Sequence, residues 1–232
     1  MHQDPMVRHE QSTRVSRLVV APRAGDEVTG CGGLLAKHHD DIAVVIVVEP
    51  APLGHGQLRT AHRMLGTPAP TILGLPDAPL AGHADRITAA LSALISRLRP
   101  RELYVPYPSL HHDHRVTYEA GVRSTRAAGA ASAMSVLAYD VSPGDDELAE
   151  VHWGVGESLL EDDVDRWVAA ALACRSPLAR DLKRRSEDCG AARGLRWAEQ
   201  FAVVRTPHEP PPAPATATAD PVAVPVLAGL SR

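Results

Sequence analysis

The chain has 232 residues, of which 44% are hydrophobic, 22% charged and only 3% aromatic, and its formal net charge is −4. This length supports one globular domain with a sizeable core, and the lack of a basic excess argues against a general nucleic-acid-binding role. A core built from Val, Leu, Ile and Ala favours parallel strands covered by helices over a β-sandwich or a β-barrel.

The cysteine content and the hydropathy indicate the cellular compartment of the protein. Cys31, Cys174 and Cys189 are widely spaced and form no CxxC pair, which argues against a disulfide framework and against a cysteine zinc site. Residues 1–16 are polar, and no apolar run reaches membrane-spanning length. We therefore expect a cytoplasmic protein without a membrane partner.

Strand-like and helix-like segments alternate after the polar N-terminal arm. Runs of apolar and β-branched residues predict strands at 17–21, 42–48, 71–75, 102–107 and 135–141. Apolar residues at helical spacing predict helices at 58–65, 85–98 and 114–128. This alternation predicts a Rossmann-like α/β fold, a mainly parallel sheet with helices on both faces, and functional residues at the carboxyl ends of the strands.

The remaining segments complete one domain. We expect an edge strand near 151–155 and two further helices at 162–174 and 178–189. From residue 206 the composition shifts to Pro, Ala and Thr without periodicity, which predicts a flexible tail. The expected organisation is an arm at 1–16, one α/β domain at 17–205 and a tail at 206–232.

Two motifs follow predicted strands and should meet at one edge of the sheet. The first reads PRAGDE at residues 22–27 and runs into the glycine-rich stretch 30–33, which is most often a plain strand-to-helix connection. The second reads YPSLHHDHR at residues 107–115. Imidazoles that flank a carboxylate can bind a metal or donate to an oxyanion, while the carboxylate orients them.

These motifs resemble the PHPDDE and HPDH elements of the PIG-L/LmbE-like zinc N-deacetylases. The resemblance runs from about residue 17 to 205 and implies an amide hydrolase of the deacetylase type. The implied partner is a small molecule, an acylated amine or an amino sugar, and the family analogy also suggests a homo-oligomer.

The resemblance assigns roles to individual residues. Asp26 and His114 match two zinc ligands, His111 matches the general acid or oxyanion stabiliser, and Asp113 matches its supporting carboxylate. Arg59 and Asp77 match positions that line the substrate pocket, and His55 and His62 fall near its border.

Two of the departures from the family pattern fall at working positions of the first motif. Arg23 stands where the third zinc ligand, a histidine, is expected, and Gly25 stands where the aspartate base is expected. Catalytic zinc usually takes three protein ligands and one open position, and a guanidinium about 4 Å from a dication is repelled by roughly 8 kcal/mol at an effective dielectric constant of 20. The sequence therefore predicts a deacetylase homologue with weakened zinc binding and reduced or non-standard activity, in which His111, His112 or Glu27 replaces the missing base.

Two alternatives remain open from the sequence. Arg23 can replace the metal by pairing with the Asp26 carboxylate and binding an anionic ligand, which gives a metal-free pseudoenzyme or a repurposed domain. Alternatively, His111 or His112 can join Asp26 and His114 in a re-formed metal site.

Overall fold

The computed structural model describes residues 14–109, 111–130, 133–141 and 154–207. Most of the predicted arm and tail, and residues 151–153 of the predicted edge strand, lie outside these ranges. The described strands are β1 (Arg17–Ala21), β2 (Ile42–Val48), β3 (Thr71–Leu75), β4 (Glu102–Pro106), β5 (Ser135–Tyr139), β6 (Val155–Ser158) and β7 (Ala198–Arg205). The described helices are α1 (Asp26–Lys37), α2 (Pro52–Leu65), α3 (Ala84–Leu98), α4 (His112–Ala127), α5 (Glu161–Ala173) and α6 (Leu182–Ala191), with a 3₁₀ turn at Leu80–His83.

The described strands form one sheet in the order β3-β2-β1-β4-β5-β7-β6. Strands β1 to β5 are parallel, whereas β7 runs antiparallel to both β5 and β6. The predicted single α/β domain with a mainly parallel sheet is confirmed. None of the described helices is long and apolar enough to cross a membrane.

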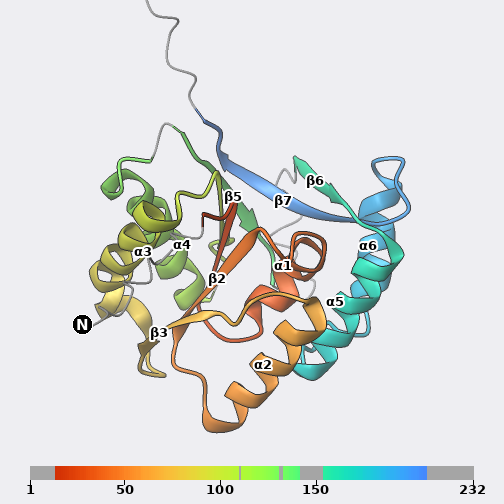
Figure 1. Cartoon of the computed structure of the whole chain (residues 1–232), viewed down its shortest axis with the longest axis horizontal. Helices are drawn as coiled ribbons and strands as arrows, with labels where there is room; N and C mark the ends of the chain where they lie inside the picture. Colours follow the sequence, from red (N-terminus) through yellow and green to blue (C-terminus); the bar gives the residue numbers. More distant parts are fainter. Residues whose placement is uncertain (1–13, 110, 131–132, 142–153, 208–232) are drawn as a thin grey trace, which may run out of the picture.

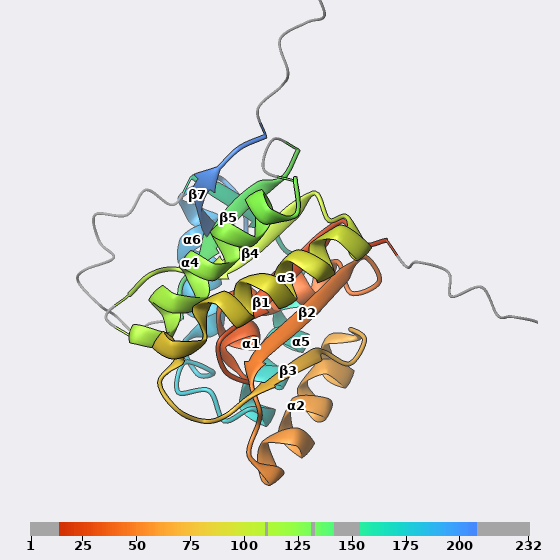
Figure 2. The same ribbon diagram turned by 90° about the vertical axis from the view of Figure 1, so that its left-hand side faces the viewer.

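Helices cover both faces of this sheet (Figures 1 and 2). On one face α1, α2 and α5 pack against alternate residues of the central strands, for example Val19 and Ala21 of β1. On the other face α3 and α4 pack against the intervening residues, Leu18 and Val20. Because successive side chains of a strand point to opposite faces, the continuous apolar sequence of β1 serves both layers.

Some element bounds differ from those predicted. Helix α2 begins at Pro52, six residues earlier than expected, because proline fits the first helical position, where its missing N–H needs no partner. Helix α6 begins only at Leu182, since a turn precedes it in which the N–H of Asp181 donates to the carbonyl of Leu178. Strand β7 was not predicted at all.

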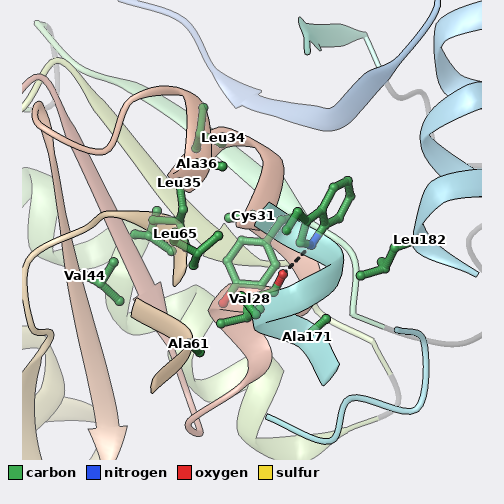
Figure 3. Close-up of a cluster of buried hydrophobic side chains, with 14 of the residues drawn as sticks. Val28, Cys31, Leu34, Leu35, Ala36, Val44, Ala61, Leu65, Ala171 and Leu182 are labelled. Carbon is green, nitrogen blue, oxygen red and sulfur yellow. Dashed lines mark hydrogen bonds between the residues drawn. The ribbon is translucent and has the colours of Figure 1, made fainter. Parts of the chain in front are cut away.

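Helix α1 lies unusually close to its neighbours because of its glycines, and Figure 3 shows the apolar cluster around it. A Cβ atom at Gly30 would lie 2.2 Å from the ring of Tyr139, and one at Gly32 would lie 2.0 Å from the indole of Trp167. The Trp167 indole donates to the Val28 carbonyl oxygen at 2.7 Å. The glycine-rich stretch therefore serves packing in the second turn of α1.

Strand β7 places a carboxylate beneath the same helix. Glu199 is 5% exposed, and its side chain accepts hydrogen bonds from the N–H groups of Leu34, at 2.7 Å, and Gly33, at 3.4 Å. Removal from water raises the pKa of Glu199 to about 8, even though both N–H groups favour the charged form.

This burial predicts a pH-dependent stability. The folded pKa lies above the unfolded one, so the stabilising preference for neutral Glu199 is complete below about pH 4.5 and is lost as the pH rises through 8. We expect this group to lower the free energy of unfolding by about 4 kcal/mol between pH 5 and pH 8.5. Glu199→Gln should abolish most of that difference in urea unfolding, whereas Glu119→Gln on the exposed side of α4 should keep it. An unchanged pH dependence in Glu199→Gln would show that the carboxyl group titrates normally.

Candidate active site

The strand order reverses between β1 and β4, so the loops that follow these two strands diverge and leave a crevice at the carboxyl edge of the sheet. A cavity of about 770 Å³ lies there. Its described lining includes Arg23, Asp26, Asp77, His111, Asp113 and His114. The structure therefore brings both predicted motifs together, along with Asp77 from the loop after β3.

The Arg23 side chain bridges two carboxylates. Its Nη1 donates to Asp77 Oδ1, and its Nη2 donates to Asp113 Oδ2 at 3.0 Å. The hydrogen bond to Asp77 is the main cause of a raised Arg23 pKa, with Asp113 adding to it against the cost of burial. The alternative in which the guanidinium pairs with Asp26 is wrong, since only the backbone N–H of Arg23 donates to Asp26 Oδ2, at 3.1 Å.

Asp113 is held from two sides. Its Oδ1 accepts the N–H of Leu80 at 3.0 Å, while its Oδ2 accepts from Arg23. Burial raises the pKa of Asp113, but the hydrogen bonds from Leu80 and Arg23 outweigh that effect and hold it below its ordinary value. Both carboxylate oxygens are thus engaged away from His111, which Asp113 was predicted to support.

Asp26 and His114 lie next to each other in the cavity lining. Asp26 Oδ2 lies 3.8 Å from His114 Nε2, and His114 Nδ1 lies 3.0 Å from the hydroxyl of Ser109. Desolvation, reinforced by nearby Glu27, raises the pKa of Asp26 to about 7. Burial, reinforced by His111, lowers the pKa of His114 to about 4, so this imidazole is neutral at pH 7.

The side chains present do not fit a three-ligand zinc centre. In the described ranges, no group of three or more His, Cys, Asp or Glu residues is placed to hold a metal ion. His111 is exposed, and its ring centroid lies 5.0 Å from that of His114. The re-formed metal site with His111 or His112 is therefore not assembled among these residues, and only the pair of Asp26 and His114 remains.

The position of the missing base is built for glycine. Gly25 has a φ angle of 103° at the start of α1, in the region that L-residues rarely adopt, and its N–H donates to Glu27 Oε2 at 2.8 Å. Glu27 is fully buried, and its Oε1 lies 3.4 Å from Nε2 of the equally buried His62. Glu27 is therefore not placed to act as the substitute base, and His62 belongs to the core.

The other predicted residues lie further out. Arg59 is exposed on α2 and is not among the described residues that line the cavity, and its role in substrate binding stays a prediction. His55 contacts Glu49 at 2.8 Å. Ser109 was not predicted as a site residue, although its position two residues before His111, in the same loop, is a usable signal.

The fold and the site together define a structural class. It is a doubly wound α/β domain that carries a cluster of carboxylates and imidazoles at its topological switch point. The model of the PIG-L family, described as GlcNAc-PI de-N-acetylase, matches residues 18–125. This match covers just under half of the chain, which over these residues is similar to the PIG-L/LmbE-like family. No curated protein matches its sequence.

Several solved structures share the fold. The conserved protein TT1542 from Thermus thermophilus is 25% identical with a TM-score of 0.67, over 85% of this chain and 98% of that chain. The N,N′-diacetylchitobiose deacetylase from Pyrococcus horikoshii is 17% identical with a TM-score of 0.62, over 82% of this chain and 83% of that chain. GalB, the 4-carboxy-2-hydroxymuconate hydratase from Pseudomonas putida, is 18% identical with a TM-score of 0.67, over 86% of this chain and 100% of that chain.

Proposed function

We propose that this chain is an N-deacetylase-type amide hydrolase homologue with an altered zinc site, in which ordinary zinc-dependent hydrolysis is strongly reduced. Its ligand is a small molecule that carries a free or acylated amino group, bound in the cavity at the carboxyl ends of β1 and β4. The match to the PIG-L family model and the deacetylases among proteins of the same fold support the hydrolase class.

One observation carries the altered-site part of the proposal. The Arg23 guanidinium, at the sequence position of the third ligand, is held between Asp77 and Asp113 and leaves Asp26 and His114 as a pair. Two protein ligands bind catalytic zinc weakly. Gly25 adds to the loss, because it has no side chain that can accept a proton from an attacking water.

The second candidate function, a metal-free binding domain, is favoured by the charge of the cavity. Among the described lining residues, the carboxylates of Asp26, Asp77 and Asp113 outnumber the single guanidinium of Arg23. This balance supports a neutral or cationic ligand and argues against the anionic ligand considered from the sequence.

A gain-of-function assay tests the proposal. The double variant Arg23→His with Gly25→Asp, supplied with zinc, should hydrolyse N-acetylated amino sugars at least about 100-fold faster than the wild type, the usual contribution of a placed general base. The positive φ at residue 25 is less favourable for aspartate than for glycine. The thermal stability of the double variant should therefore be measured alongside its activity.

Adding His114→Ala to the double variant should remove the gain. The proposal fails if the wild type already hydrolyses these amides efficiently with zinc and loses that activity in His114→Ala alone.

A further inference from the structure

Two acceptor atoms face the cavity without a cationic side chain between them. Asp26 Oδ2 lies 3.8 Å from His114 Nε2. In the part of the chain that the structure describes, no Lys or Arg nitrogen lies within ion-pair distance of the Asp26 carboxylate, whose other contact is the backbone N–H of Arg23. The Asp26 carboxyl group is therefore left without a side-chain counterion within ion-pair distance.

The second acceptor is a buried imidazole that points into this space. His114 is 8% exposed and lines the cavity. Its Nδ1 is engaged by the Ser109 hydroxyl at 3.0 Å, and the same hydroxyl oxygen accepts the N–H of His111 at 3.3 Å. In the tautomer whose Nδ1 carries the proton and donates to Ser109, Nε2 keeps its lone pair. Within the described residues Nε2 has no hydrogen-bond partner.

The neighbouring guanidinium compensates the Asp26 carboxylate only in part. Both terminal nitrogens of Arg23 donate to other carboxylates, those of Asp77 and Asp113. The single positive charge of the guanidinium is therefore already shared between two carboxylates, and Asp26 is a third. An amide brings no charge to such a site, whereas a primary ammonium brings one positive charge and three donors.

We propose that Asp26 and His114 together bind the primary ammonium group of a small ligand, so that the cavity selects a free amine over its N-acyl form. This inference rests on the proposed function and names the ligand class of the same site. A single ammonium nitrogen can lie about 2.9 Å from both acceptors and donate to each. In this arrangement the ammonium takes the place between Asp26 and His114 that a metal ion would otherwise need.

Calorimetric titration of the full chain with glucosamine and with N-acetylglucosamine, both in the presence of a metal chelator, tests this selection. We expect glucosamine to bind at least about tenfold more tightly, the usual effect of a charge-assisted hydrogen bond. Asp26→Asn keeps an acceptor for the Arg23 N–H but removes the charge, and it should bring the two affinities within about twofold. Asp85→Asn, on the exposed surface of α3, is the matched control and should keep the wild-type preference.

The inference is overturned if glucosamine does not bind, binds no more tightly than its N-acetyl form, or keeps its preference in a folded Asp26→Asn variant. Metal content and the amidase assay decide the proposed function independently. A zinc-free, hydrolytically inactive chain that prefers N-acetylglucosamine would retain the proposed function and contradict only the ammonium site.

Discussion

Arg23→His is expected to raise the affinity for zinc by at least about 100-fold, which corresponds to about 2.7 kcal/mol. The substitution supplies the third ligand beside Asp26 and His114 and removes the repulsion between a guanidinium and a dication. The Coulomb repulsion between bare charges overstates this gain, because the Arg23 side chain is 43% exposed and already paired with Asp77 and Asp113. Competition with a chromophoric chelator measures the dissociation constants.

Arg23→Gln separates the two contributions, because glutamine removes the charge without providing an imidazole. We expect it to recover about tenfold, less than histidine does, since charge relief alone leaves zinc with two ligands. Equal zinc affinities for the wild type and Arg23→His would mean that Arg23 does not stand at a ligand position.

Gly30→Ala is expected to destabilise the protein by about 2 to 3 kcal/mol, or roughly 5 to 10 °C in Tm for a domain of this size. The new methyl group would lie 2.2 Å from the Tyr139 ring. That ring is fully buried, and its hydroxyl donates to the Val20 carbonyl oxygen at 2.8 Å, so it cannot move aside cheaply. Thermal and urea unfolding measure the loss.

Gly56→Ala in α2 is the matched control. It is also a helical glycine, but an added Cβ at this position meets no atom within 4 Å. Alanine should therefore stabilise the helix by about 0.5 to 1 kcal/mol. Opposite signs at the two positions are expected, and a stability change of the same sign at both would contradict the packing of α1 against Tyr139.

The fold was predictable in those segments where burial of a strand requires a run of apolar residues in the sequence. The strands β1 and β2 have the predicted bounds, because their apolar runs mark strands that are covered on both faces. Strand β3 also has the predicted bounds, although it lies at the sheet edge and has a single buried residue. Strand β7 was missed since Glu199 interrupts its apolar pattern, and a carboxylate in a strand is normally read as exposed. Its burial depends on N–H groups of α1 that are 165 residues or more distant in the sequence.

The candidate site was predictable in its location but not in its contacts. The rule that ligands bind at the carboxyl ends of parallel strands is enough to place the loops after β1 and β4 together. The partners of Arg23 were not predictable, because Asp77 and Asp113 are 54 and 90 residues away and three-residue spacing made Asp26 the obvious candidate. Long-range ion pairs depend on side-chain geometry that no local pattern encodes.

These contacts connect the ends of three strands. Arg23 follows β1, Asp77 follows β3, and Asp113 lies in the first turn of α4 after β4. The Leu80 N–H that donates to Asp113 attaches the loop after β3 to the same group. A guanidinium therefore organises this edge of the sheet, while the neighbouring Asp26 and His114 remain open towards the cavity.

Zinc stoichiometry of the purified wild-type chain, after dialysis against zinc and measured by elemental analysis, tests this account most directly. We predict no stoichiometric zinc in the wild type and no difference between it and Asp26→Ala. One zinc ion per wild-type chain that is lost in Asp26→Ala would contradict the account, because it would show a metal bound beside Arg23.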